Sequence, residues 1–314
     1  MKIAVSGCLL GEEIRFDRGH KRDTFLVDEL GKYAEFISFC PENLAFGTPR
    51  PTIRMVKEDD RVKIVSNKDG KELGDPLLQA SQRELKKIKA AEIRGIVFKS
   101  KSPTCGLKSS RVYLPNGFAA QKDDGVFASA CKKEFDYLPM EEEGRLNDMW
   151  LRENFVMQLF AYDHFEVFKK DATMKDLVVF HQSYKFLLQS KEDMLYRELG
   201  RVVANHEKKS FEEVLQAYEK RFKMAIAKKS GIGKTRNVLE HMAGFLKNFL
   251  NAQEKKMLHE QIEDFSNKIV PLIVPISTLK LYATKYEVAY LLGQKFLDPY
   301  PKDLALRSDI KSVK

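Results

Sequence analysis

Three cysteines in the first third of the chain share one sequence context, because each follows closely on a short apolar run. These are Cys8, Cys40 and Cys105, which follow the apolar runs at 3–5, 36–39 and 96–98. Short apolar runs that end in Gly, Pro or Ser predict buried strands, and ligands of α/β sheets bind beyond the carboxyl ends of such strands. If the three strands are parallel neighbours, we expect the three thiols to converge at one edge of the sheet.

Thiols that come from separate loops suit some metal centres better than others. Four-cysteine zinc sites usually contain a Cys-x-x-Cys pair, because one tight turn then supplies two ligands, and this chain has no such pair. An iron–sulfur cluster accepts thiolates from different elements, and with three protein ligands one iron would stay open to act as a Lewis acid. The alternative is three small buried hydrophobic side chains, since free cysteine is among the most buried residue types. The residues alone leave both interpretations open.

The fourth cysteine has a different setting. Cys131 lies in a predicted helix opened by Gly125, among Phe127, Ala128 and Phe135. A thiol on the apolar side of a helix packs in the core more often than it binds metal. We therefore expect Cys131 to be a core residue.

Polar side chains near the three cysteines are candidates for proton transfer and hydrogen bonding. Glu42 stands two residues beyond Cys40, in what we expect to be a loop, where a carboxylate can act as a general acid or base. Ser100, Ser102 and Thr104 precede the third cysteine and could hydrogen-bond a cluster sulfide or a substrate carbonyl. The alternatives are a solvated carboxylate and ordinary loop capping.

The segment Gly231-Ile-Gly-Lys-Thr235 resembles the end of a phosphate-binding P-loop. The first glycine that this motif requires would fall at position 228, which is a lysine, and the segment follows a helical pattern instead of a strand. We therefore do not expect an ATP site. The basic charge here is either a solvated helix face or a candidate RNA-binding patch, whose central residues are Lys228, Lys229, Lys234 and Arg236.

Strands and helices alternate over the first part of the chain, up to residue 139. Besides the three apolar runs, the alternation at 61–66 predicts a half-exposed strand, and residues 113–118 predict a turn between short extended pieces. Helical spacing occurs at 24–33 and again at 77–93. Strands that alternate with helices predict a parallel, Rossmann-like α/β sheet.

A charged break follows Leu138-Pro139, and we place the domain boundary there, with domains at 1–139 and 148–314. From Asn147 onward, apolar residues recur at spacings of three and four, with few strand signals. This pattern predicts an all-α C-terminal domain.

Length and composition narrow the class of protein. The chain of 314 residues is 43% hydrophobic, which is enough for two ordinary domain cores. It has no apolar run near the roughly 18 residues of a membrane span, and its first residues lead into a strand instead of a signal peptide. We therefore expect a cytoplasmic protein with no membrane partner and no disulfides. The formal net charge of +9 is compatible with RNA as a partner but does not require it.

Five motifs, in this order along the chain, resemble the thiouracil desulfidase family. They are Ser6-Gly-Cys-Leu-Leu-Gly11, Arg15-Phe-Asp-Arg-Gly-His-Lys21, Cys40-Pro-Glu42, Thr48-Pro-Arg50 and Lys99-Ser-Lys-Ser-Pro-Thr-Cys-Gly106. The second half is similar to a YbgA-like helical domain through three further motifs. These are Phe180-His-Gln-Ser-Tyr-Lys185, Asn237-Val-Leu-Glu-His241 and Gln294-Lys-Phe-Leu-Asp-Pro-Tyr-Pro301.

The resemblance implies a cofactor and a set of site residues. The cofactor is a [4Fe-4S] cluster with one open iron that binds the sulfur of a thiolated pyrimidine, and its three ligands correspond to Cys8, Cys40 and Cys105. The candidate catalytic residues are then Glu42, Ser100 and Ser102. The same motifs supply the candidate substrate-binding residues Arg15, Asp17, His20, Arg50 and Lys101.

The two-domain form resembles the desulfidases that remove sulfur from 4-thiouridine in transfer RNA. The leading hypothesis is therefore a non-redox desulfidase that yields uridine and hydrosulfide, with a catalytic domain at 1–139 and a tRNA-binding, YbgA-like domain at 148–314. One alternative is a desulfidase of free thiouracil or another small sulfur compound. Another is a non-catalytic iron–sulfur protein that binds nucleic acid and senses redox state, although a structural site normally takes all its ligands from protein.

Overall fold

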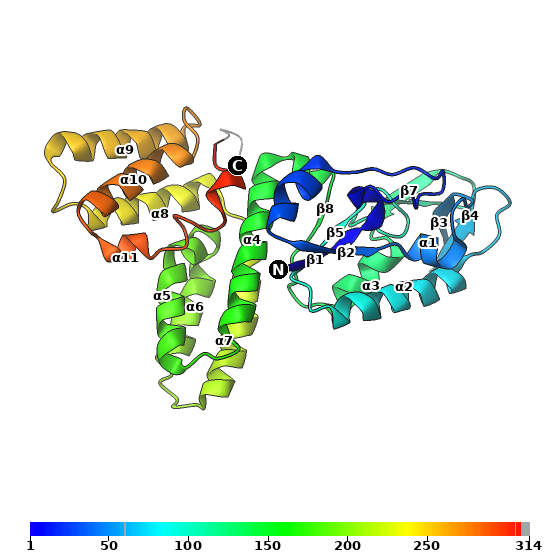
Figure 1. Cartoon of the computed structure of the whole chain (residues 1–314), viewed down its shortest axis with the longest axis horizontal. Helices are drawn as coiled ribbons and strands as arrows, with labels where there is room; N and C mark the ends of the chain where they lie inside the picture. Colours follow the sequence, from blue (N-terminus) through cyan, green and yellow to red (C-terminus); the bar gives the residue numbers. More distant parts are fainter. Residues whose placement is uncertain (60, 305, 309–314) are drawn as a thin grey trace. The chain divides into compact units, whose positions relative to one another are not determined.

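The computed structural model describes residues 1–59, 61–304 and 306–308 of the chain. It divides into two compact units, Met1–Asn147 and Asp148–Lys314, which are drawn from blue to green and from green to red in Figure 1. The final residues of the predicted helical domain, 309–314, lie outside the described part.

A four-stranded parallel sheet forms the centre of the N-terminal unit, with the strand order β2-β1-β5-β8. Its strands are β1 (Lys2–Ser6), β2 (Glu35–Phe39), β5 (Gly95–Phe98) and β8 (Met140–Glu142). β1 pairs in parallel with β2 on one side and with β5 on the other. β5 is buried along its whole length, as expected for a parallel sheet with both faces covered. The predicted parallel α/β fold is confirmed.

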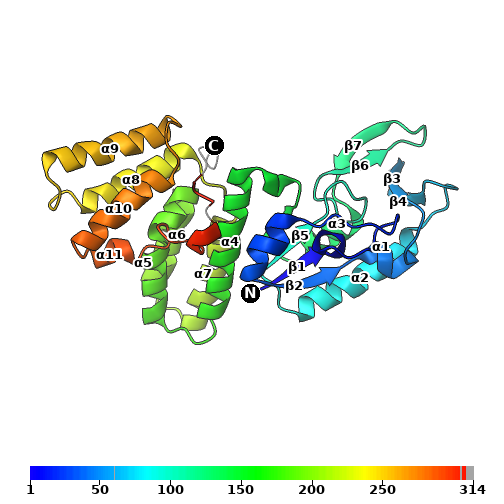
Figure 2. The same cartoon turned by 45° about the horizontal axis from the view of Figure 1, so that its top comes forward.

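The N-terminal unit also has three α-helices, each of which comes after a strand in the chain (Figures 1 and 2). They are α1 (Pro41–Phe46), α2 (Gly74–Ala90) and α3 (Val126–Glu134). Phe127 of α3 packs on Phe39 of β2 and Phe98 of β5, with ring centroids 4.9 and 6.3 Å away. Each of these fully buried rings contributes about 1.5–3 kcal/mol of burial free energy, so α3 fixes the ends of two strands that lead to cysteines.

A second, mixed sheet has the strand order β4-β3-β6-β7. Its strands are β3 (Ile53–Glu58), β4 (Arg61–Ser66), β6 (Ser110–Tyr113) and β7 (Ala119–Asp123). One face packs on a small core that includes Met55, Ile64 and Val112, and β7 is exposed along its length. The sequence predicted the strand at 61–66 and the turn at 113–118, but not the sheet that joins them.

The C-terminal unit is helical, as predicted. Its helices are α4 (Met149–Phe168), α5 (Met174–Lys191), α6 (Asp193–Ala204), α7 (Phe211–Ile226), α8 (Ile232–Phe245), α9 (Ala252–Ser266), α10 (Ile273–Lys285) and α11 (Ala289–Leu292). An aromatic cluster packs α4, α5 and α7 together. In it, the Phe165 ring of α4 stacks on the Phe222 ring of α7, with the ring centroids 5.1 Å apart. Among the described residues, no helix has the length and apolar character needed to span a bilayer.

The stretch at 24–33, where the sequence shows helical spacing, is helical but is not a regular α-helix. The structure has a π-helical turn at Phe25–Glu29 followed by a 3-10 turn at Leu30–Lys32. At Gly31, an added Cβ would lie 3.2 Å from the Phe36 ring and 3.3 Å from the Leu26 carbonyl oxygen. Glycine therefore lets the end of this segment pack closely against β2.

Candidate functional site

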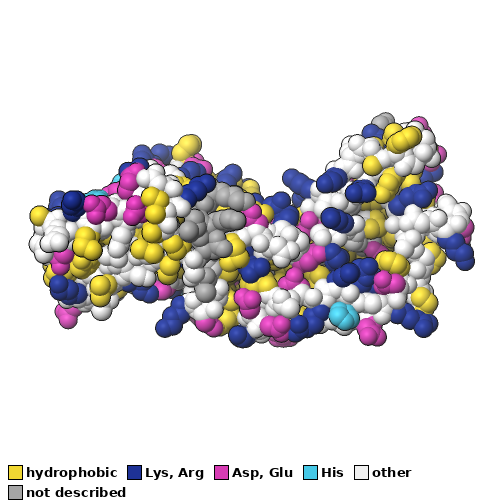
Figure 3. Space-filling model, turned by 90° about the horizontal axis from the view of Figure 1, so that it is seen from above, with side chains coloured by type: hydrophobic (Ala, Val, Ile, Leu, Met, Phe, Trp, Pro, Cys, Tyr) yellow, Lys and Arg dark blue, Asp and Glu magenta, His cyan; other side chains and the backbone are white. Residues whose placement is uncertain are grey.

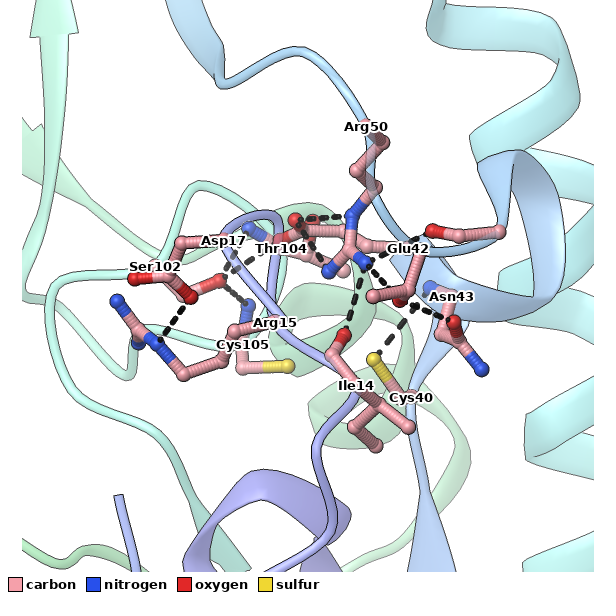
Figure 4. Close-up of polar contacts among 12 residues, drawn as sticks. Ile14, Arg15, Asp17, Cys40, Glu42, Asn43, Arg50, Ser102, Thr104 and Cys105 are labelled. Atoms are coloured by element: carbon pink, nitrogen blue, oxygen red, sulfur yellow. Dashed lines mark hydrogen bonds and ion pairs between the residues drawn. The ribbon is translucent and has the colours of Figure 1, made fainter. Parts of the chain in front are cut away.

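The three cysteines converge, as their strand ends predicted. Cys8 lies in a 3-10 turn directly after β1, Cys40 directly follows β2, and Cys105 lies in the loop after β5. All three line one cavity of about 410 Å³ at the carboxyl edge of the parallel sheet. Figure 4 shows the sulfur atoms of Cys40 and Cys105 directed into the same space.

The loop that carries Cys105 is held by close backbone contacts. An added Cβ at Gly125 would lie 2.5 Å from the carbonyl carbon of Thr104, so this position requires glycine. The backbone N–H of Phe127, in the first turn of α3, donates to the Thr104 carbonyl at 2.9 Å. Ser102 Oγ accepts from the backbone N–H of Cys105 at 3.1 Å. The position of this thiol is therefore set by the start of α3 and by its own loop.

Burial makes all three thiols costly to ionise, and neighbouring cysteines add to this cost for Cys8 and Cys105. Burial, and then the neighbouring Cys40, raise the pKa of Cys8 to about 12, although Lys99 and Arg15 act in the opposite direction. Burial also raises the pKa of Cys40, and burial together with both other cysteines raises the pKa of Cys105. Three thiolates this close together require a compensating cation, and metal ions deprotonate coordinating thiols.

The donor set fits a soft metal cluster. Three thiols and the Glu42 carboxylate line the cavity, and thiolates select iron–sulfur clusters and soft metals. Within the described residues, no three His, Cys, Asp or Glu side chains are placed to hold a single metal ion. An iron–sulfur cluster takes its thiolates at separate irons and so from more widely spaced positions. Cys131, in contrast, is fully buried within α3 and does not line the cavity.

Glu42 is held firmly in the cavity wall. The expectation that it lies in a loop is wrong, because Cys40 caps the short helix α1 and places Glu42 in its first turn. Arg50 Nη2 pairs with Glu42 Oε2 at 3.2 Å, and Ser102 Oγ donates to Glu42 Oε1 at 3.1 Å (Figure 4). Arg50 itself donates to the Ile14 carbonyl at 2.8 Å. Glu42, Arg50 and Ser102 thus form one polar group on the wall.

A second polar group on the wall contains residues that the sequence analysis did not single out. Lys99 Nζ pairs with the carboxylate of Glu143, which directly follows β8. Ser100 Oγ donates to Glu143 Oε1 at 2.8 Å, and its backbone N–H donates to Glu143 Oε2 at 2.6 Å. The Ser100 hydroxyl is therefore committed to Glu143. Lys99 was within a recognised motif, whereas Glu143, far along the chain, gave no local signal.

The predicted substrate-binding residues divide into two sets. Arg15, Arg50 and Lys101 line the thiol cavity. Asp17 and His20 do not, because Asp17 binds Arg15 Nε at 3.4 Å and the Gly19 N–H at 3.1 Å. The Arg22 N–H donates to His20 Nδ1 at 3.2 Å. Asp17 and His20 thus shape the loop that supplies Arg15.

The predicted RNA-binding residues lie together at the junction of α7 and α8. A helix precedes the P-loop-like segment there, which confirms the helical pattern predicted before it. Lys234 pairs with Glu192 at 3.0 Å and Arg236 with Glu263 at 2.5 Å. Lys229 Nζ lies 5.2 Å from the centroid of the Trp150 ring. Carboxylates therefore compensate the charges of Lys234 and Arg236.

The fold and the cavity define a class of protein: an α/β domain that can hold a soft metal cluster with three thiolates. Residues 3–143 match the model of the 2-thiouracil desulfurase family, and residues 185–301 match a model described as a protein of unknown function, DUF1722. Residues 3–143 thus form a domain that matches the 2-thiouracil desulfurase family, and a DUF1722 region, similar to YbgA, follows it in the helical unit.

Two known proteins resemble one part of the chain each. The uncharacterized protein YbgA of Escherichia coli K12 is 25% identical over 154 residues, which cover 48% of this chain and 91% of that protein. The solved structure of the [4Fe-4S]-dependent thiouracil desulfidase TudS is 26% identical, covers 49% of this chain and 99% of its own, and has a TM-score of 0.40.

Proposed function

We propose that this protein removes the sulfur from a thiolated pyrimidine at a [4Fe-4S] cluster, and that its substrate is 4-thiouridine in transfer RNA. The observation that carries the reaction class is the convergence of three thiols from three adjacent parallel strands in one cavity, beside a held carboxylate. The match of residues 3–143 to the desulfurase family supports the same chemistry.

The ligands of the cluster would be Cys8, Cys40 and Cys105, which leaves no cysteine to bind the remaining iron from this cavity. When bound, such a cluster supplies an iron without a protein ligand, which acts as a Lewis acid toward the thiocarbonyl sulfur. The overall reaction is a hydrolysis with no electron transfer. A C–O bond to water forms, the C–S bond breaks, and the protons of the water leave with sulfur as hydrosulfide and a free proton.

Glu42 is the residue best placed to take a proton from the attacking water. Arg50 donates to Oε2 from both Nε and Nη2, and Ser102 donates to Oε1, whereas a carboxylate has about four acceptor sites. One acceptor site on Oε1 therefore remains for a water in the cavity. Ser102 and Arg50 act as positioning residues for Glu42, and Ser100 positions the Lys99–Glu143 pair.

The choice of transfer RNA over a free base rests on the second unit. A single base needs only the cavity, whereas a base inside a folded RNA requires contacts to the surrounding phosphates. The helical unit offers Lys228, Lys229, Lys234 and Arg236 for such contacts. Turning the base out of its stack costs a few kcal/mol, which phosphate contacts would offset.

The test is to purify the protein without oxygen, count iron and sulfide, and measure hydrosulfide release from thiolated tRNA and from free 4-thiouracil. We expect about four irons per chain and faster release from tRNA. A colourless protein without iron would contradict the mechanism. RNA binding without any loss of sulfur would instead favour a redox sensor. Turnover of free 4-thiouracil but not of thiolated tRNA would favour a small-molecule enzyme.

Glu42→Gln separates proton transfer from folding. Arg50 keeps the carbonyls of Ile14 and Gly47 as acceptors in this variant, so we expect the fold and the iron content to persist. Because general acid–base catalysis contributes about 10²–10⁴-fold, turnover should fall by at least about 10²-fold. Glu13→Gln, at an exposed carboxylate of the same unit, is the matched control and should keep full turnover.

A further inference from the structure

The solvent face of the second sheet carries a row of basic side chains on three adjacent strands. Met55 of β3 pairs with Val112 of β6, so the preceding residues, Arg54 and Arg111, are direct neighbours across the two strands. On the other side, Arg111 pairs with Lys122 of β7. Paired residues point to the same face of a sheet, so Arg54, Arg111 and Lys122 form a continuous line of positive charge.

A cavity of about 560 Å³ lies beside this row. Its lining includes Arg54, Arg111 and Tyr113, and it shares three residues with the thiol cavity. The shared residues are Ile53, Lys101 and Pro103. A ligand that holds its thiolated base near the cysteines can therefore continue past Lys101 into this second cavity. Lys and Arg side chains gather over the N-terminal unit on the face shown in Figure 3.

The charges of this row are not compensated by carboxylates. Arg54 Nη1 donates to the neutral side chain of Asn67 at 3.1 Å. In the described part of the chain, the side chains of Arg54, Lys101, Arg111 and Lys122 form no ion pair, and the Arg54–Asn67 bond is their one side-chain hydrogen bond. Like charges directly opposite each other destabilise a sheet. The row contrasts with Lys63 on β4, which pairs with Glu58 at 2.5 Å.

We propose that this row and its cavity bind the phosphodiester backbone of the RNA strand that carries the thiolated base. Tyr113, two residues beyond Arg111 on β6 and also in the cavity lining, offers an aromatic surface on which a flanking base can stack, as single-stranded RNA does on other sheets. The inference rests on the proposed function, because it names how that site selects a base inside RNA. It places the first phosphate contacts on the catalytic unit itself.

The test compares charge removal at matched places. Arg54→Gln/Arg111→Gln removes two charges from the row, and Arg83→Gln/Lys86→Gln removes two exposed charges from α2 in the same unit. A third variant neutralises Lys228, Lys229, Lys234 and Arg236 in the helical unit. Affinity for 4-thiouridine-containing tRNA is measured at several salt concentrations, with circular dichroism and iron content as checks of folding and loading.

We expect the Arg54/Arg111 variant to bind tRNA at least about tenfold more weakly at low salt, and its log K against log salt slope to flatten by about 1.4–1.8, or 0.7–0.9 per lost phosphate contact. The α2 variant should bind as the wild type does. If the log K against log salt plot of Arg54→Gln/Arg111→Gln has the same slope as that of the wild type, the inference is overturned. A flatter slope in the helical-unit variant alone would place the phosphate contacts on the helical unit instead. The proposed function is tested separately, by hydrosulfide release from the wild type, so the two measurements can fail independently.

Discussion

Each unit holds an arginine–glutamate ion pair with little solvent exposure, and these two pairs differ in what surrounds them. In the N-terminal unit, Arg50 and Glu42 line the thiol cavity, with side chains 4% and 17% exposed. In the helical unit, Arg307 and Glu153 are 5% and 3% exposed and pair at 2.7 Å. There, Tyr300 OH also donates to Glu153 Oε1 at 3.1 Å, and Arg307 Nη1 donates to the Phe296 carbonyl at 2.6 Å.

The Arg50–Glu42 pair can contact a ligand in the cavity, whereas the Arg307–Glu153 pair can contribute only to the stability of the helical unit. Buried ion pairs add little net stability, because the cost of desolvation is near the Coulomb gain. Glu42 lines a cavity and keeps an acceptor site on Oε1, whereas Glu153 is enclosed by its own unit. Substitutions at the cavity should therefore change cofactor or turnover, and substitutions in the helical core should change stability alone.

The largest expected effect is at the cysteines. Cys8→Ala, Cys40→Ala and Cys105→Ala should each lose most of the iron, because each removes one of three ligands. Cys131→Ala should keep full iron content, since this thiol is enclosed in α3, and should cost only about 1 kcal/mol of stability. Iron and sulfide analysis of anaerobic preparations decides the point. Loss of iron from the Cys131 variant would mean four protein ligands and no open iron.

The next effect is in the helical core. Arg307→Met leaves the Glu153 carboxylate buried without its cation, so we expect the free energy of unfolding to fall by about 3–5 kcal/mol. The double variant Glu153→Gln/Arg307→Met should recover much of this loss. Trp150, the single tryptophan, lies on α4 and reports unfolding of this unit by fluorescence. The comparison between the two pairs would fail if Arg307→Met also lowered the iron content.

Much of the fold was predictable because its signals are local. The runs at 3–5, 36–39 and 96–98 correspond to β1, β2 and β5, and the strand ends sufficed to predict that the thiols meet. The second sheet was missed because its two hairpins, β3–β4 and β6–β7, are joined by a pairing that is not local: β3 and β6 lie about fifty residues apart in sequence and share only two paired positions. Such short contacts leave no periodic signal in the chain.

The sequence predicted the site residues that directly follow a strand. It did not predict contacts between residues that are distant in sequence. Lys99 and Ser100 bind Glu143, which is 44 and 43 residues away. The sequence also could not reveal that His20 caps its own loop, because this depends on the Arg22 N–H at 3.2 Å. Side-chain direction is set by such tertiary contacts, which spacing alone does not encode.

The smallest expected effect concerns a buried lysine of the helical unit. Lys191, at the end of α5, is fully buried, and its Nζ donates to the Lys228 carbonyl at 2.9 Å and to Asn154 Oδ1 at 3.3 Å. These two acceptors match the two N–H groups of a neutral amine. Burial lowers the pKa of Lys191 to about 7, although Glu153 acts in the opposite direction.

The sign of the pH dependence follows from this lowered pKa. An unfolded lysine titrates near pH 10.4, so from about pH 7 upward the unfolded chain binds one proton more than the folded chain. The free energy of unfolding should therefore rise with pH, by at most about 1.4 kcal/mol per pH unit. Urea unfolding followed by Trp150 fluorescence between about pH 7 and 9.5 measures this, below the usual tyrosine range. Lys191→Met should remove the rise, whereas Lys175→Met, at an exposed position of the same helix, should retain it. Equal slopes in wild type and Lys191→Met would show that this lysine stays charged in the folded unit.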